Sequence, residues 1–209
     1  MQQQDPIVYV VDDDEAIRSA LRLLMKSADL RVVICASAEE FLKSYKPEVP
    51  GCLVLDVRMP GMSGLELQRL LLDRHVRVPV IIMSGHGDVS MAVQAMKDGA
   101  VDFIEKPFKN EVLLERVKQC IAQDVEIRKE QRQHVEATTR IASLTPRERE
   151  VMELLIQGKR NKIIASDLGI SNRTVEAHRA KIMEKMHAHS LSEIVRTSFA
   201  ADEASAEHG

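Results

Sequence analysis

The sequence predicts two domains of different fold class. The first is an α/β domain on a doubly wound, five-stranded parallel sheet, and the second is an all-α domain of four helices with a helix-turn-helix. Short apolar runs alternate with amphipathic helical stretches as far as residue 123. A polar stretch without Gly or Pro follows, and beyond residue 144 the helical spacing continues without any strand pattern.

Five apolar runs bounded by turn residues predict the strands of one sheet. The run at residues 52–55 has four consecutive apolar residues, which is typical of a strand buried on both faces. Capping residues and helical spacing between the runs predict helices. The expected strands are residues 7–11, 31–36, 52–55, 80–83 and 103–105. The expected helices are residues 14–28, a short helix opened by Ser37, residues 64–73, a helix from Asp88 to Gly99, and one capped by Asn110.

A solvated helical linker is expected over residues 124–143, with a new domain opening at Leu144. Thr145 and Glu148 have the spacing of a capping box, and Pro146 stands at the first helical position. These two start signals together indicate a domain boundary.

The second domain, residues 144–199, has the pattern of a helix-turn-helix: a short helix, a turn with Gly, and a longer helix rich in Arg and Lys. Ser171 or Asn172 is expected to cap the longer helix, and a last helix is expected to run through Phe199. The remaining segments are a helix over 161–168 that stops at Gly169, the longer helix over 174–186, and a disordered tail over 200–209.

The composition indicates a cytoplasmic protein without a membrane segment. No apolar run is long enough to span a bilayer, and the first residues lack the pattern of a signal peptide. Three cysteines without C-x-x-C spacing are typical of buried thiols in a reducing compartment. Residues 1–124 carry 15 Lys and Arg against 19 Asp and Glu, whereas residues 144–199 carry 10 against 7, so the basic second domain suits nucleic-acid binding.

Polar side chains stand at the carboxyl ends of four expected strands: Asp12, Asp13, Asp56, Ser84 and Lys106. Ligands bind at that edge of an open parallel sheet. Taken singly, an Asp run can be a helix cap and Ser84 or Lys106 a surface residue, but their shared position favours a site. Clustered carboxylates repel one another unless a cation joins them, and all-oxygen ligands suit Mg²⁺. Asp56 is then the expected nucleophile towards a phosphoryl group, which the Lys106 ammonium and the Ser84 hydroxyl would contact. A cis Lys106–Pro107 peptide could place the ammonium, but the trans form is the expectation.

The site resembles the receiver domain of two-component response regulators, a flavodoxin-like domain, in four segments: Val11-Asp12-Asp13-Asp14, Asp56-Val57-Arg58-Met59-Pro60-Gly61, Ser84-Gly85-His86-Gly87 and Lys106-Pro107-Phe108. Residues 144–186 resemble the DNA-binding domain of the NarL/FixJ (LuxR-type) class, and within it the FixJ branch. The resemblance implies a receiver domain over residues 1–123.

The resemblance also implies roles for individual residues. Asp56 would take a phosphoryl group from a sensor histidine kinase, and Ser84 and Phe103 would form a switch pair. Mg²⁺ would be held by Asp13, Asp56 and the backbone carbonyl of Arg58, with Asp12 acting through water. Phosphorylation is expected to promote a homodimer through residues 89–100 and 103–106, and then binding to double-stranded promoter DNA. RNA polymerase is a further expected partner.

The helix after Gly169 is expected to enter the major groove. Glu176, Ala177 and Ala180 would face base edges, and the basic side chains would contact phosphates. An intrahelical pair of Glu176 with Arg173 or Arg179 is an equal alternative. The expected DNA-binding residues are Lys162, Asn172, Arg173, Thr174, Glu176, Ala177, Arg179, Ala180 and Lys181.

Two other classes of protein share part of this pattern. A phosphatase of the haloacid-dehalogenase type also uses an aspartate nucleophile, but it needs an acid/base Asp two residues later, where this chain has Arg58. No enzyme activity is therefore expected. An interaction adaptor without DNA binding is disfavoured by the basic helix over 173–185.

Overall fold

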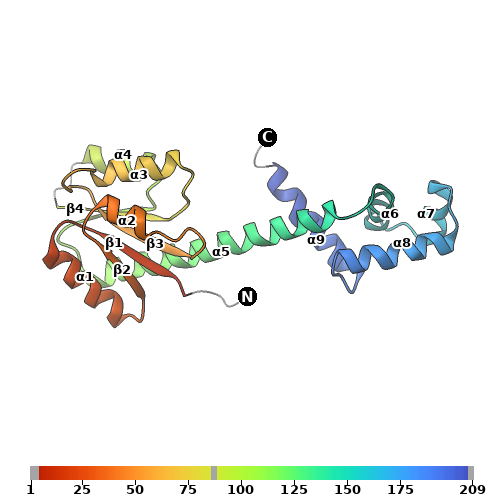
Figure 1. The fold of residues 1–209 in the computed structure, drawn as a ribbon, viewed down its shortest axis with the longest axis horizontal. Coiled ribbons are helices and arrows are strands. Elements are labelled where there is room, and N and C mark those ends of the chain that lie inside the picture. Colours follow the sequence, from red (N-terminus) through yellow and green to blue (C-terminus); the bar gives the residue numbers. More distant parts are fainter. Residues whose placement is uncertain (1–4, 86–88, 207–209) are drawn as a thin grey trace. The chain divides into compact units, whose positions relative to one another are not determined.

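The computed structural model describes residues 5–85 and 89–206, and for Val89 and residues 202–206 only the backbone. The chain divides into two compact units between Arg128 and Lys129 (Figure 1). The expected capping role of Asp88 lies outside the described residues.

The first unit is built on one parallel sheet, as the sequence predicts. Its strand order is β2-β1-β3-β4-β5, with every neighbouring pair parallel. All residues of β1, β3 and β4 are buried, because helices cover both faces of the sheet. The strands are β1 (Ile7–Val11), β2 (Arg31–Cys35), β3 (Gly51–Asp56), β4 (Val80–Ser84) and β5 (Asp102–Glu105).

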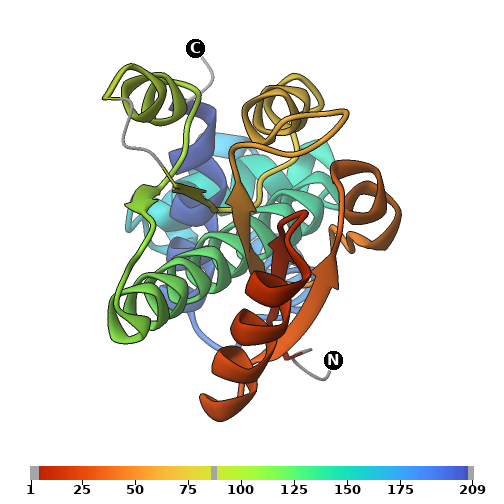
Figure 2. The same cartoon turned by 90° about the vertical axis from the view of Figure 1, so that its left-hand side faces the viewer.

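Five helices form the two outer layers, and alternate residues of each strand face them. Side chains such as Tyr9 and Leu55 pack on one face with α2, α3 and α4. Side chains such as Val10 and Val54 pack on the other face with α1 and α5 (Figure 2). The helices are α1 (Glu15–Ser27), α2 (Ala38–Ser44), α3 (Gly64–Asp73), α4 (Val89–Lys97) and α5 (Asn110–Ala142).

The start of α3 lies directly against the end of β3. Gly64 donates its N–H to the carbonyl oxygen of Val57 at 3.0 Å. A Cβ at Gly64 would come within 2.1 Å of the carbonyl oxygen of Asp56, so only Gly fits here. The Ser63–Glu66 capping box sets where α3 begins.

Helix α5 continues without a break through the expected linker. The beginning of that segment is not solvated, because Asp124 is 3% exposed. Its Oδ2 accepts from the backbone N of Gly51 at 2.8 Å and from Nε of Arg128 at 2.7 Å, and Arg128 also donates to the carbonyl of Pro47 at 2.5 Å. Residues 124–128 are therefore anchored to the amino-terminal edge of the sheet, and the unit ends later than the sequence suggests.

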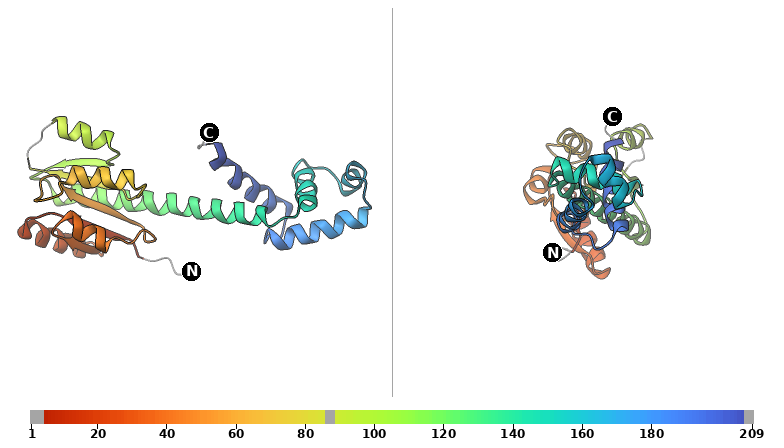
Figure 3. Two further views of the ribbon diagram at one scale, coloured as in Figure 1. Left: turned by 45° about the horizontal axis from the view of Figure 1, so that its top comes forward. Right: turned by 90° about the vertical axis from the view of Figure 1, so that its right-hand side faces the viewer.

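The second unit contains the expected helix-turn-helix (Figure 3). Gly169 ends its first helix in the left-handed region, with φ at 64°, and Ser171 caps the second. The last helix does not stop at Phe199, so the expected disordered tail is helical as far as Ala206. The helices are α6 (Pro146–Ile156), α7 (Asn161–Leu168), α8 (Asn172–Lys185) and α9 (Leu191–Ala206).

A buried carboxylate joins the start of α6 to the end of α8. Glu148 is 3% exposed, and its Oε2 accepts from Lys185 Nζ at 2.6 Å and from the backbone N of Thr145 at 2.9 Å. The hydrogen bond from Lys185, and then that from Thr145, lowers the pKa of Glu148 to about 2. The capping box of α6 is thereby tied to the end of α8. Throughout the described part of the chain, no helix is both long and apolar enough to cross a membrane.

Candidate functional site

Two carboxylates meet at the carboxyl edge of the sheet, where the strand order reverses. Asp12 follows β1 directly and Asp56 is the last residue of β3, and these two strands are hydrogen-bonded neighbours. Both side chains are buried, at 1% and 6% exposure. The crevice at such a reversal is where doubly wound sheets bind ligands.

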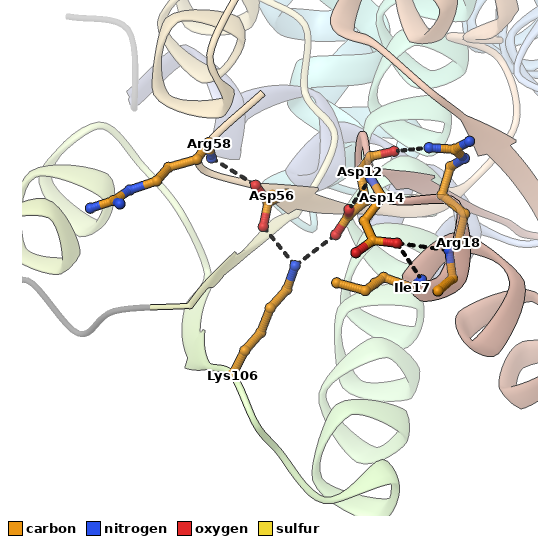
Figure 4. Close-up of polar contacts among 8 residues, drawn as sticks. Asp12, Asp14, Ile17, Arg18, Asp56, Arg58 and Lys106 are labelled. Carbon is orange, nitrogen blue, oxygen red and sulfur yellow. Dashed lines mark hydrogen bonds and ion pairs between the residues drawn. The ribbon is translucent and has the colours of Figure 1, made fainter. Parts of the chain in front are cut away.

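Lys106 bridges the two carboxylates. Its Nζ lies 2.7 Å from Asp12 Oδ2 and 2.7 Å from Asp56 Oδ1 (Figure 4). Burial alone would lower the pKa of Lys106, but the two carboxylates together raise it, so the ammonium stays charged. Burial raises the pKa of Asp12, against the hydrogen bond from Lys106. The Lys106–Pro107 peptide is cis, contrary to the expectation from the sequence.

Backbone donors and Arg18 fix the rest of the site. Asp56 Oδ2 accepts from the backbone N of Arg58 at 2.7 Å, and Asp12 Oδ1 accepts from the backbone N of Asp14 at 2.9 Å. Arg18 donates to the carbonyl oxygen of Asp12 at 2.8 Å, as Figure 4 shows. Each carboxylate thus has one oxygen held by backbone and the other held by Lys106.

A cavity of about 330 Å³ opens over these groups. Ser84 is 1% exposed and lines it from the end of β4, whereas the side chain of Arg58 is exposed and extends away from Asp56 (Figure 4). Phe103 does not line the cavity; it lies on β5, partly buried against the core beneath α2, α3 and α4. The lining residues are Asp12, Asp13, Asp14, Ile17, Asp56, Val57, Arg58, Ser84, Gly85 and Lys106.

The donor set of this cavity fits Mg²⁺. Four carboxylates line it, against the Lys106 ammonium and the Arg58 guanidinium, so its formal charge is negative. Within the described ranges no three His, Cys, Asp or Glu side chains converge as a ready-made metal cage. Mg²⁺ needs no such cage, because it binds through one or two carboxylates and keeps several waters.

The expected DNA-binding residues share the outer face of the helix-turn-helix. Val175 and Ile182 of α8 are buried in the core, and of the nine candidates only Arg179 is partly buried. Arg179 donates to Oδ1 of Asn161 at 2.7 Å, which ties α8 to the start of α7. Glu176 accepts from Asn172 at 3.1 Å, so its partner here is neither Arg173 nor Arg179.

Some contributors to the site carry no signal in the sequence. The contact of Arg18 depends on how α1 returns over the edge of the sheet. The need for Gly64 depends on the approach of α3 to Asp56. Asp14 caps α1, as the helix-cap reading of the Asp run implies, and its Oδ1 accepts from the backbone N of Ala16 at 2.8 Å.

Two family models match the chain. The response regulator receiver domain matches residues 8–118, and the luxR family of bacterial regulatory proteins matches residues 142–198. The chain therefore belongs to the two-component response regulators, in the group that joins a receiver domain to a luxR-type DNA-binding domain. This is a family of transcriptional regulators and not a class of enzymes. The receiver implies a histidine kinase partner, and the luxR-type domain implies DNA binding.

Within this family the chain is FixJ-like. The transcriptional regulatory protein FixJ of Azorhizobium caulinodans is 48% identical over 96% of this chain and 95% of its own length. Nodulation protein W of Bradyrhizobium diazoefficiens is 44% identical over 92% of this chain and 85% of its own length.

Two solved structures of response regulators are similar to this chain over most of its length. The response regulator StyR matches with a TM-score of 0.86 and 42% identity, over 93% of this chain and 98% of its own. Full-length FixJ from B. japonicum matches with a TM-score of 0.58 and 44% identity, over 94% of this chain and 97% of its own.

Proposed function

We propose that Asp56 is the phosphoacceptor of this response regulator, and that its phosphorylation promotes dimerisation and binding to promoter DNA. The observation that carries the proposal is the pair of 2.7 Å contacts from Lys106 Nζ to Asp12 and Asp56 at the reversal point of the sheet. A phosphoryl group on Asp56 Oδ1 would break the contact between that oxygen and Lys106. The ammonium would then bind the phosphoryl oxygens.

The transfer forms one bond and breaks one bond. Asp56 attacks phosphorus with Oδ1 while Oδ2 stays bound to the N–H of Arg58, and the bond from phosphorus to the kinase histidine breaks, its electron pair staying on nitrogen. Asp12, Asp13, Asp56 and the Arg58 carbonyl would hold Mg²⁺, which when bound offsets the negative charge of carboxylates and phosphoryl oxygens. Lys106 and the Ser84 hydroxyl also bind phosphoryl oxygens.

The signal then passes to α4 and β5. Ser84 ends β4, which leads towards α4. Its backbone carbonyl accepts from the backbone N of Lys106, the residue after β5, at 2.7 Å. Ser84 and Phe103 act as the switch pair, the hydroxyl moving to the phosphoryl group and the ring moving inward. Exposed apolar side chains on this side of the unit provide the dimer surface, namely Val93, Met96 and Val101.

A two-fold dimer would present two copies of α8 to successive turns of the major groove. Glu176, Ala177 and Ala180 read base edges, and the basic side chains contact phosphates. RNA polymerase would meet the regulator at the promoter. The shift from a mostly inactive to a mostly active population needs roughly 5 kcal/mol of differential free energy, within reach of a buried phosphoryl group bound by Lys106 and a cation.

Acetyl phosphate with Mg²⁺ tests the proposal. Intact mass should show one added phosphoryl group on the wild-type protein and none on Asp56→Asn. Asp73→Asn, at an exposed position at the end of α3 outside the cavity, is the control that keeps the acceptor and the metal-binding residues. Sedimentation should show a larger species after beryllofluoride treatment. Equal labelling of Asp56→Asn would refute the assignment. An unchanged mass in sedimentation after beryllofluoride treatment, together with stronger DNA binding, would refute dimerisation as the mechanism.

A further inference from the structure

The backbone of Asp12 is held beyond the end of the sheet. The register of β1 with both of its neighbours ends at Val11, so the carbonyl oxygen of Asp12 lies past the two ladders. That oxygen accepts from Nη1 of Arg18 at 2.8 Å, while the N–H of Asp12 donates to the carbonyl oxygen of Cys35 at 3.3 Å. A backbone carbonyl near the core needs a donor, and here a side chain of α1 supplies it.

The start of α1 brings Arg18 back to Asp12. Asp14 caps the helix through its side chain, and its carbonyl oxygen accepts from the backbone N of Arg18 at 3.0 Å. Arg18 therefore stands one turn into α1, and it reaches Asp12 from a different side than Lys106 does (Figure 4). Arg18 is partly buried, whereas Arg22, one turn further along, is exposed. A hydrogen bond from a charged donor is roughly twice as strong as a neutral one.

Arg18 influences the cavity through Asp12. Arg18 is not one of the described residues that line the cavity, whereas the carboxylate of Asp12 is 1% exposed and does line it. The carboxylate oxygens accept from the backbone N of Asp14 at 2.9 Å and from Lys106 at 2.7 Å, which fixes the side-chain torsions. Arg18 and Cys35 fix the two peptide groups to which that side chain is attached. Together these four bonds hold the carboxylate in one position.

A fixed carboxylate is important for binding Mg²⁺. This cation demands near-ideal octahedral geometry at about 2.0–2.1 Å, so a carboxylate that binds it, directly or through a water, has to stand at a set distance. Groups that hold metal-binding residues from behind typically contribute about 10- to 100-fold in metal affinity. Arg18 has the position of such a group, because it binds the backbone of a residue whose side chain lines the cavity.

The charge of Arg18 and its positioning effect act in opposite directions. The guanidinium is positive and lies beside an acidic cavity, so its charge alone weakens the binding of a cation. If charge were its whole effect, removing it would tighten Mg²⁺ binding. If it positions Asp12, removing it loosens Mg²⁺ binding instead. The sign of the change in affinity therefore separates the two roles.

We propose that Arg18 is a positioning residue for the metal site, which holds the Asp12 carboxylate in place for Mg²⁺ by binding the backbone carbonyl of the same residue. This role rests on the proposed function, since it takes Mg²⁺ as the ligand of the cavity. A side chain of α1 outside the cavity then sets the affinity for Mg²⁺, and with it the Mg²⁺ concentration at which Asp56 is phosphorylated.

A Mg²⁺ titration of the full-length protein, followed by the amide NMR signals of residues 12–14 and 56–58, tests the role of Arg18. Arg18→Met removes the donor and keeps an unbranched side chain, and Arg22→Met is the matched control that removes the same charge one turn along α1. Arg18→Met should bind Mg²⁺ about tenfold more weakly than wild type, and Arg22→Met within about twofold of wild type. Arg18→Lys keeps a charged donor and should bind Mg²⁺ more tightly than Arg18→Met. An affinity of Arg18→Met equal to or above that of wild type would overturn the proposal.

Hydrogen exchange in the metal-free proteins shows whether the effect passes through the Asp12 backbone. The amide of Asp12 should exchange at least about fivefold faster in Arg18→Met than in Arg22→Met, because the backbone of Asp12 loses one of its two bonds. Equal exchange in the two variants would contradict an action through that backbone.

Labelling by acetyl phosphate separates this role from the proposed function. Arg18→Met should need about tenfold more Mg²⁺ for half-maximal labelling and should reach a rate within about twofold of wild type at saturation. A slower rate at saturation with an unchanged Mg²⁺ requirement would contradict a role at the metal. A wild-type protein that binds Mg²⁺ but is not labelled on Asp56 would refute the proposed function instead, and the titration of the unmodified variants would still decide the role of Arg18.

Discussion

A methyl group at Gly64 should disturb both the stability of the receiver domain and its phosphorylation. Its carbon would lie 2.1 Å from the carbonyl oxygen of Asp56 and 3.1 Å from Cγ of Leu55. Carbon and oxygen ordinarily approach to about 3.3 Å, so the start of α3 and the end of β3 must separate by roughly 1 Å.

The magnitude follows from two opposing terms. Overpacking in a buried contact costs about 1–3 kcal/mol, and the higher helix propensity of Ala returns up to about 1 kcal/mol. We expect Gly64→Ala to lower the free energy of unfolding by about 1–2 kcal/mol. A displacement of roughly 1 Å at a reacting group can slow a reaction about a hundredfold, so phosphorylation by acetyl phosphate should slow by at least about tenfold.

Urea unfolding and a time course of intact mass measure the two effects. Gly85→Ala is the matched control, because Gly85 borders the same cavity and a Cβ there meets nothing within 4 Å. Its free energy of unfolding should stay within about 0.5 kcal/mol of wild type. If Gly64→Ala proves as stable as wild type and is labelled at the wild-type rate, the close approach of α3 to Asp56 does not constrain the site.

Three further predictions concern buried or paired charges. Without divalent cations, Lys106→Ala should lower the free energy of unfolding by about 3 kcal/mol, because Asp12 and Asp56 lose the ammonium between them, and Mg²⁺ should restore part of it in thermal unfolding. Glu148→Gln should lower the free energy of unfolding of the second unit most above about pH 4.5, because the folded-state pKa of Glu148 is lowered. The difference in free energy between variant and wild type should shrink as the pH falls towards about 2. Urea unfolding at about pH 7 and about pH 3 measures this difference. Arg179→Ala should cost about 1–2 kcal/mol of stability through its lost bond to Asn161, whereas Lys181→Ala should leave stability unchanged and reduce the salt dependence of DNA binding by about one unit of slope. An Arg179→Ala protein of wild-type stability, or a Lys181→Ala protein of wild-type salt dependence, would contradict this division of roles.

Local patterns were sufficient for the elements of secondary structure. The run at residues 52–55 is apolar throughout and is followed by Asp56, and a strand there buries every side chain. Thr145 and Glu148 have capping-box spacing, and the structure contains both hydrogen bonds of that box. Signals of this kind involve residues within one turn, so the sequence displays them directly.

End points that depend on distant contacts were less predictable. The expected linker begins at Asp124, but that carboxylate is buried because Gly51 and Arg128 supply its donors. The last helix passes Phe199 and continues to Ala206, and His134 Nδ1 of α5 lies 2.8 Å from the carbonyl oxygen of Ala200 there. The cis form of the Lys106–Pro107 peptide is also a property of the folded chain, since proline alone favours trans.

By itself, the sequence determined the class of the fold, the family, and the set of polar residues at the strand ends, because periodicity, capping and motif spacing are local. Only the tertiary structure decided how those residues meet, with Lys106 between Asp12 and Asp56. It also decided that Gly64 lies against the Asp56 carbonyl and that Gln68 of α3 donates to the Ala95 carbonyl of α4. Parallel strands and packed helices bring together residues far apart in the chain, and the distances between their atoms depend on the packing of both cores. No local pattern contains that information.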